Sequence, residues 1–379
     1  MLFSLASWNI FIHRSILIYG VIENVMDFNL KTLRKAGLLS TLLLLTHYSQ
    51  ASNIDIYGTI NLSADRITSI TNNESVEDLT IASNSSSLGF KGKTELGYNL
   101  TAVWQLENGI DVSGETGSIS ARNRFLGLSH QYGSLLMGIY DTPYKTLAKK
   151  MDIMPWSIAD RRTMLGVSVL GPTSIDLRAR NSVVYISPSF YGFEARLMQT
   201  TGNDTNKAGD SNSVTSTSLL YDNEGLYAGV SYEIQNGVNT DPTTGRPIDT
   251  TGIRIAGGYH STSLSLNAIY EILQSDTNPE FDRPAYGSSI SYKISDTTFK
   301  AQGFLVGDYQ DQPDSNASLF AFGVSQNMAK NTEIYILYAF NNNAARSRTA
   351  LGGPAHGETY TPDFGENMQS SSLGIIYRF

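Results

Sequence analysis

Apolar and polar residues alternate with a period of two along much of the chain after residue 51. In the first such segment, the even-numbered positions from Ile54 to Leu62 are mostly isoleucine and leucine, and the odd-numbered positions are mostly polar. Segments 100–108 and 372–379 alternate in the same way. This period predicts β-strands with one apolar and one polar face. A soluble β-sandwich gives the same alternation, so the number and spacing of the strands must separate a sandwich from a barrel.

Short turns alternate with long polar stretches along the chain. We identify seven short turns, and eight longer stretches rich in Asn, Asp, Gly, Ser, Thr and Pro; the turns are at 94–97, 130–134, 190–193, 222–225, 260–262, 295–297 and 329–331. Fifteen connections join sixteen strands, and the 328 residues after residue 51 (379 − 51) allow about 20 residues per strand and connection. That spacing fits strands of ~9–11 residues that cross a bilayer at a tilt. The sequence therefore predicts an all-β fold, a transmembrane antiparallel β-barrel of 16 strands.

The N-terminal region has the features of an export signal. Lys31, Arg34 and Lys35 precede the apolar run 36–46, and the small residues of Ser49-Gln50-Ala51 follow it. This order is typical of a secretory signal peptide, and the apolar run is too short to span a bilayer. We expect residues 26–51 to be a signal peptide cleaved after Ala51, and residues 1–25 to come from a misassigned upstream start. An unusually long signal is the alternative. Residues 52–379 would form a single barrel domain.

Composition and charge exclude several classes of protein. The chain has no cysteine, which excludes a disulfide scaffold, a thiolate metal site and a cysteine nucleophile. Residues 52–379 carry 23 basic (27 − 4) and 33 acidic (35 − 2) residues, a net charge of −10 that argues against binding of nucleic acid. Three histidines remain after residue 51, namely His130, His260 and His356. Because they are not spaced as metal ligands and lie near no candidate nucleophile, we expect solvated histidines, no catalytic residue, no metal and no cofactor.

Several passages resemble the Gram-negative general porins. Ser87-Leu88-Gly89-Phe90-Lys91-Gly92 with Glu95-Leu96-Gly97, the segment 100–107, the segment 180–193 and the terminal Phe379 resemble strands and turns of that family, in the same order. The resemblance covers essentially the whole chain after the signal. It implies a sixteen-stranded barrel in the outer membrane of a Gram-negative cell, usually a homotrimer. It also implies a water-filled channel for passive diffusion of ions and small hydrophilic solutes, and no enzymatic activity.

The resemblance also implies a constriction and partners. The third long loop, residues 141–177, would fold into the pore, and Asp152-Ile153-Met154-Pro155 resembles a passage of the family's constriction loop. Arg124 and Arg180 match basic positions of the pore wall, and the loop would supply Asp152 and Asp160 opposite them. Trp156 stands where an acidic residue is common. The last strand, with Tyr377 and Phe379, would close the barrel and contact the barrel-assembly machinery, and the outer face would contact lipid and lipopolysaccharide.

The residues themselves support a charged pore wall. Period-two alternation assigns each of three basic pairs to a polar strand face: Lys91 with Lys93, Arg122 with Arg124, and Arg178 with Arg180. Such a cation facing lipid at midplane costs ~2–4 kcal/mol, so we expect these side chains to face the lumen. The loop also contains basic and apolar residues. Its apolar side chains, among them Met151, Met154, Ile158, Met164 and Leu165, favour a packed loop.

Two questions stay open at this level. Arg161 and Arg162 either add positive charge to the pore, which would favour anions, or pair with Asp160 or Asp176 and hold the loop. A receptor or adhesin barrel that acts through its long loops is an alternative function, and a barrel enzyme is another. An enzyme would need a nucleophile, a base and an orienting group at the barrel rim, and we can assemble no such set.

Overall fold

The structure is a computed structural model that describes residues 54–71, 74–114, 119–166, 175–201, 212–240, 246–275, 282–357 and 362–379. The predicted signal peptide, residues 26–51, and the preceding residues 1–25 lie outside these described residues. No helix in the described part of the chain combines the length and the apolar composition needed to cross a bilayer.

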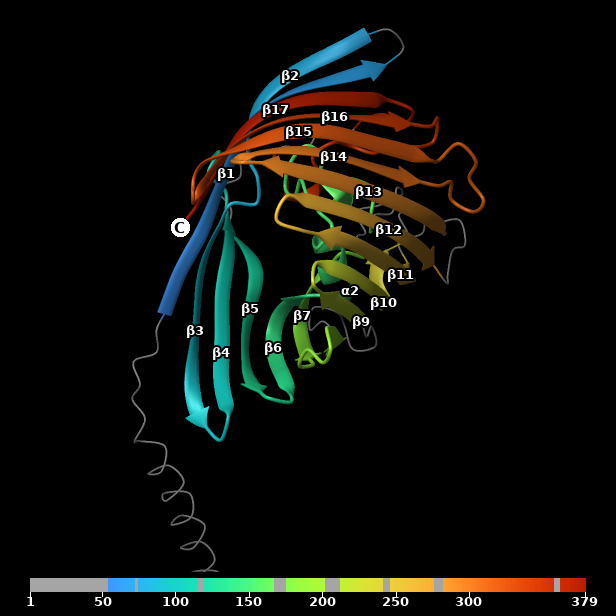
Figure 1. The fold of residues 1–379 in the computed structure, drawn as a ribbon. Helices are drawn as coiled ribbons and strands as arrows, with labels where there is room; N and C mark the ends of the chain where they lie inside the picture. Colours follow the sequence, from blue (N-terminus) through green and yellow to red (C-terminus); the bar gives the residue numbers. More distant parts are fainter. Residues whose placement is uncertain are drawn as a thin grey trace, which may run out of the picture. The chain divides into compact units, whose positions relative to one another are not determined.

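The described residues form seventeen antiparallel strands in one sheet (Figure 1). The strands are β1 (Ile54–Thr71), β2 (Glu74–Ser83), β3 (Ser87–Gly97), β4 (Leu100–Ile110), β5 (Ile119–His130), β6 (Gly133–Asp141), β7 (Arg178–Ile186), β8 (Phe193–Thr200), β9 (Ser213–Asn223), β10 (Leu226–Thr240), β11 (Pro247–His260), β12 (Leu264–Ser275), β13 (Arg283–Ile294), β14 (Thr297–Val306), β15 (Ala317–Ala329), β16 (Thr332–Asn343) and β17 (Asn367–Arg378). Three short helices are described between them: α2 (Pro143–Lys149), η1 (Arg161–Thr163) and η3 (Gly353–Ala355).

Strands β2 and β3 together occupy one position in the sheet. β1 pairs with β3 from Ile54 to Thr59 and with β2 from Leu62 to Thr71. The three residues between β2 and β3 oppose only two residues of β1, and Ser85 there has a φ of 54°. This is a bulge of one extra residue. The seventeen described strands therefore fill sixteen positions, which confirms the predicted sixteen-stranded antiparallel barrel.

The sheet closes through its first and last strands. β17 pairs with β1 in continuous register, from Arg378 opposite Thr59 to Asn367 opposite Ile70. Beyond that register, the Gly58 amide donates to the Phe379 carbonyl at 2.9 Å, and the Phe379 amide donates to the Gly58 carbonyl at 3.1 Å. A Cβ at Gly58 would lie 2.4 Å from the Phe379 ring and 2.8 Å from the Ser87 carbonyl oxygen, and the backbone contact favours glycine at this close approach. As predicted, the strand that carries Tyr377 and Phe379 joins the first strand.

The seven short turns join neighbouring strands as expected. The first turn lies slightly later than predicted, since β3 continues to Gly97 and the turn residues are Tyr98 and Asn99. Both have positive φ angles, 53° and 60°. Two consecutive residues with positive φ match the right-handed twist of a hairpin, and Asn tolerates this conformation better than most residues.

The two faces of the sheet differ in the way the alternation predicts. On β1, Ile54 and Ile56 are exposed, whereas Asn61, Ser63 and Asp65 are buried. The exposed large side chains of the other strands continue this apolar face, for example Leu126 and Leu128 on β5 and Leu373 and Ile375 on β17. We call this the apolar face, and the opposite one the polar face.

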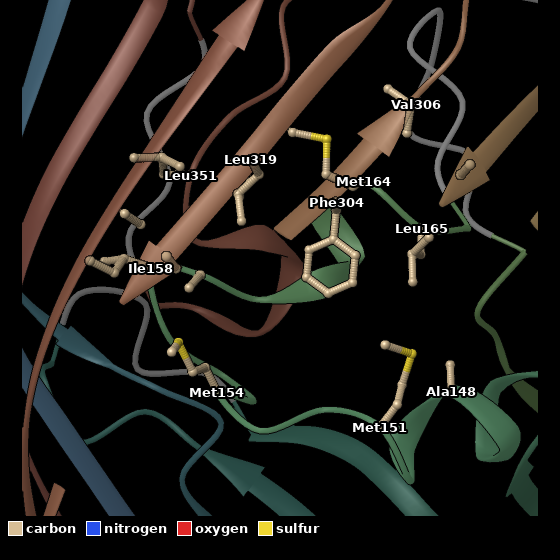
Figure 2. Close-up of a cluster of buried hydrophobic side chains, with 14 of the residues drawn as sticks. Ala148, Met151, Met154, Ile158, Met164, Leu165, Phe304, Val306, Leu319 and Leu351 are labelled. Atoms are coloured by element: carbon tan, nitrogen blue, oxygen red, sulfur yellow. The ribbon is translucent and has the colours of Figure 1, made fainter. Parts of the chain in front are cut away.

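The long connection between β6 and β7 packs into a hydrophobic cluster. Figure 2 shows Met151, Met154, Ile158, Met164 and Leu165 of this segment together with Phe304 of β14 and Leu319 of β15. All seven side chains are buried. This confirms the expectation of a packed loop, and the burial of so many apolar side chains favours one conformation of the segment.

Polar side chains of the strands also hold the segment. The Gln302 amide of β14 donates to the Ala159 carbonyl at 2.6 Å, and the Ser289 hydroxyl of β13 donates to the Met151 carbonyl at 3.0 Å. Each strand residue satisfies a carbonyl that lacks a helix or sheet partner. The segment is therefore fixed to the polar face of the sheet by both apolar and polar contacts.

A buried group of charges anchors the segment to β11 and β12. Arg254 of β11 is fully buried; it donates to Asp176 at 2.7 Å, to the Tyr144 carbonyl at 3.0 Å and to Glu271 of β12 at 2.8 Å. The Tyr144 hydroxyl and the Gly166 amide both donate to Glu271, at 2.9 and 2.7 Å. One arginine thus connects both ends of the segment to the wall.

We predict that Arg254→Met releases the segment and lowers the free energy of unfolding by about 3–5 kcal/mol, because it leaves two buried carboxylates without their main partner. The thermal midpoint in detergent and limited proteolysis within 142–177 would measure this. Arg66→Met is the matched control, since Arg66 pairs with Glu77 at 2.6 Å but both side chains are more than half exposed. It should change stability by no more than about 1 kcal/mol. Equal effects of the two variants would contradict the prediction.

Candidate functional site

A cavity of about 570 Å³ lies between the β6–β7 segment and strands at the start and end of the chain. Its lining includes Ser83 of β2, Gly109 of β4, Arg122 of β5, Trp156 of the segment and His356 of the β16–β17 connection. Residues far apart in the sequence therefore meet here because the barrel is closed. α2 contributes to the lining as well; its N-cap Thr142 and the following Pro143 start the helix in the manner expected for a short capped turn.

Basic side chains dominate the lining. Among the described residues, six basic and two acidic side chains line the cavity: Arg122, Lys145, Lys149, Arg161, Arg162 and Arg178 against Asp111 and Asp152. Fixed cations concentrated in a narrow space attract anions and repel cations.

Carboxylates that do not line the cavity hold these cations in place. Asp141 at the end of β6 is buried and pairs with Lys145 at 3.0 Å, with Arg178 at 3.1 Å and with Lys149. Glu107 of β4 pairs with Arg122. Seen from the cavity, Asp141 and Glu107 thus lie behind the basic side chains that they pair with. Solvent in the cavity contacts mainly the positive partners of these pairs.

The loop arginines take part in ion pairs within their own segment. Arg161 is buried; it donates to Asp176 at 2.6 Å and lies 3.4 Å from Asp152. Arg162 pairs with Asp160 through two hydrogen bonds of 2.7 and 3.0 Å. The pairing with Asp160 and Asp176 considered above is therefore present, and the same two arginines also line the cavity.

Burial and neighbouring charges shift several pKa values in this segment. Burial, together with the nearby Asp160 carboxylate, raises the pKa of the Asp152 carboxyl to about 7 against the opposing effect of Arg161. Burial also opposes ionisation of Asp160 and Asp176, but arginines outweigh it and lower the pKa of both carboxyls. Burial lowers the pKa of Lys145 to about 8, against the effect of Asp141. One carboxyl and one ammonium of the lining therefore titrate near neutral pH.

A β-bulge in β5 separates Arg122 from Arg124, which the alternation places on one face. In β5, Arg124 lies opposite Leu106 of β4 and Ile139 of β6, and its guanidinium donates to the side chain of Asn108. Directly opposed residues share a face, so Arg124 lies on the apolar face with the exposed Leu106. Between Leu106 and Asn108 the register shifts by one residue, and Arg122 lines the cavity. The two arginines do not share a face.

A second bulge lies in β7, beside Arg180. Ser182 lies opposite Gly138 and Ala179 lies opposite Tyr140, so Arg180 and Asn181 both oppose a single residue of β6. Asn181 has a φ of 50°, which marks the bulge. Arg178 donates to Asn123 at 3.0 Å and lines the cavity, whereas Arg180 is exposed and is not part of the lining. The bulge therefore does not fall between Arg178 and Arg180, and Arg178 is the member of this pair that lines the cavity.

Lys91 and Lys93 lie on the polar face of β3, away from this cavity. Lys91 is directly opposite Asp55 of β1, and its ammonium lies 5.2 Å from the centre of the Tyr57 ring. Both lysines are exposed. They form a separate part of the polar wall.

Sequence reasoning missed several residues of the site. Glu107 and Asp141 hold the cations, and alternation could have found Glu107, which shares a strand face with Gln105. The expectation that His356 is solvated is wrong: it is buried, and its Nε2 lies 2.9 Å from Oδ2 of Asp65. That contact joins the last long connection to β1, and no sequence pattern relates residues so far apart.

The chain is similar to known outer-membrane proteins. A family model described as Gram-negative porin matches residues 40–346. The major outer membrane protein P.IB of Neisseria lactamica is 22% identical over 316 residues, which covers 80% of this chain and 92% of that protein.

Solved structures agree with the family match. An anion-selective porin from Comamonas acidovorans superimposes with a TM-score of 0.74 at 21% identity, over 86% of this chain and all of that one. OmpT of Vibrio cholerae, solved in a trimer form, has a TM-score of 0.64 at 17% identity over 87% of this chain and all of that one. The chain belongs to the Gram-negative porin family, a family of channels, and forms an outer-membrane channel for passive diffusion.

Proposed function

We propose that the cavity lined by six basic side chains is the narrowest part of the channel, that residues 141–177 narrow it, and that it makes the channel prefer anions. The observation that carries this proposal is the excess of basic over acidic groups in the lining. Asp152, one of the two carboxyls there, has a pKa of about 7 and is therefore only partly charged at neutral pH. The selectivity of a narrow pore depends on its width and on the charges that line it.

The net charge of the protein does not decide the selectivity. Residues 52–379 carry a net charge of −10, but exposed charges more than about 8–10 Å away are screened at physiological ionic strength. The basic groups of the lining lie at the cavity itself. Their effect on a passing ion therefore exceeds that of acidic residues elsewhere on the surface. One solved structural relative is described as an anion-selective porin, which is compatible with this proposal.

We also propose that the functional unit is a homotrimer, in contact with lipid and lipopolysaccharide and inserted by the barrel-assembly machinery through β17. Arg124 and Asn108 form a polar pair on the apolar face. A cation that faces lipid near midplane costs ~2–4 kcal/mol, so contact with a second copy would remove an unfavourable exposure to lipid. OmpT of Vibrio cholerae forms a trimer.

We predict that the protein in a planar bilayer with a salt gradient gives a reversal potential of the sign expected for chloride preference. Arg122→Gln should lower the chloride-to-potassium permeability ratio about twofold or more, because it removes a cation of the lining and leaves the Glu107 carboxylate without its ion-pair partner. Arg180→Gln is the control, because Arg180 does not line the cavity. Potassium preference in the unchanged protein would overturn the proposed selectivity.

We predict that the chloride preference falls as pH rises from about 6 to about 9. Two changes act in the same direction: Asp152, with a pKa of about 7, gains a negative charge, and Lys145, with a pKa of about 8, loses its positive charge. Reversal potentials measured across this range should show the change. Asp152→Asn should remove the change at the lower end of this pH range. Lys145→Met should remove the change at its upper end. A pH profile that neither substitution alters would contradict the assignment.

A further inference from the structure

Trp156 of the β6–β7 segment lines two cavities. With Pro155 it lines the cavity of about 570 Å³ and also a smaller cavity of about 70 Å³. The smaller cavity is lined by Lys300 of β14, Glu333 of β16 and Arg378 of β17. Basic groups therefore lie on both sides of the indole. Trp156 and Pro155 therefore form a wall that the two cavities share.

The backbone of Trp156 has an unusual conformation. Trp156 has a φ of 57°, which is rare for a bulky residue and costs energy unless the surroundings impose it. Its amide donates to Asp160 at 3.2 Å, and the Ser157 hydroxyl donates to the Met154 carbonyl at 2.8 Å. Met154 and Ile158 on either side are buried, whereas Trp156 stays partly exposed. The segment thus fixes an aromatic surface at the cavity wall instead of burying it.

A fixed guanidinium lies beside this aromatic surface. The Arg122 guanidinium is 5.8 Å from the centre of the Trp156 ring, within cation–π range. Arg122 is oriented by Glu107 and by the Ser85 hydroxyl, which accepts a hydrogen bond of 2.5 Å. Because Glu107 and Ser85 orient Arg122 and the segment orients Trp156, the cation and the indole form one preorganised recognition surface.

We propose that Trp156 and Arg122 form a subsite for aromatic carboxylates on the permeation path. The carboxylate of such a solute would bind the guanidinium, and its ring would stack on the free part of the indole. Chloride or acetate can make only the first contact. This inference rests on the proposed anion preference and adds to it the class of solute that the channel favours.

Bilayer permeability to benzoate and to cyclohexanecarboxylate, each relative to chloride, tests the subsite. The two ions have the same charge and similar size, but only benzoate has a π-face. In the unchanged protein we expect a preference for benzoate of about three- to tenfold, the range that stacking and cation–π contacts supply. Trp156→Leu should abolish the preference and Trp156→Phe should keep part of it. Trp104→Leu, on the apolar face of β4, should leave it unchanged.

Fluorescence gives a second measurement that does not depend on conductance. After residue 51 the tryptophans are Trp104 and Trp156, so the Trp104→Phe variant of that chain reports on Trp156 alone. Benzoate should change its emission in a saturable way, cyclohexanecarboxylate much less, and Arg122→Gln should weaken the response to benzoate. Chloride preference with equal permeability and equal fluorescence response for both carboxylates would overturn the subsite and leave the anion preference intact. Potassium preference would overturn both.

Discussion

Closure of the sheet by hydrogen bonds between β1 and β17 is the constraint on which the rest of the structure depends. The paired amides and carbonyls of Gly58 and Phe379 continue a register that runs to Asn367 and Ile70. Closure satisfies backbone groups that lipid cannot satisfy. It also brings β2 and β5 near the connection that precedes β17, so that Arg122 and His356 line one cavity although they are distant in the sequence.

The ion pairs that hold the β6–β7 segment also set the charge of the cavity. Asp141 and Asp176 are buried and each binds more than one cation, and several of those cations line the cavity. A buried carboxylate stays ionised only when such partners offset the loss of hydration. Arg161 and Arg162 form ion pairs within the segment and also belong to the lining of the cavity.

Alternation predicted the strands, their faces and the closing role of the last strand because a period of two maps directly onto the faces of a sheet. It failed at Arg124 because a bulge of one residue between Arg122 and Arg124 reverses the later side chains of β5. The Asn181 φ of 50° marks one bulge, yet nothing in the residue pattern around it separates the bulge from regular strand. His356 was misjudged because its partner, Asp65, is reached only after the barrel closes.

The sequence by itself determined that residues after 51 form a sixteen-stranded barrel with an apolar and a polar face, and that the segment between β6 and β7 packs, since both follow from local period and composition. Only the tertiary structure decided which basic residues line one cavity and which carboxylates pair with them. It also decided that Trp156 lines two cavities. Those facts depend on register shifts and on contacts between strands distant in the chain. Such contacts form only when the closed sheet fixes every strand relative to its neighbours.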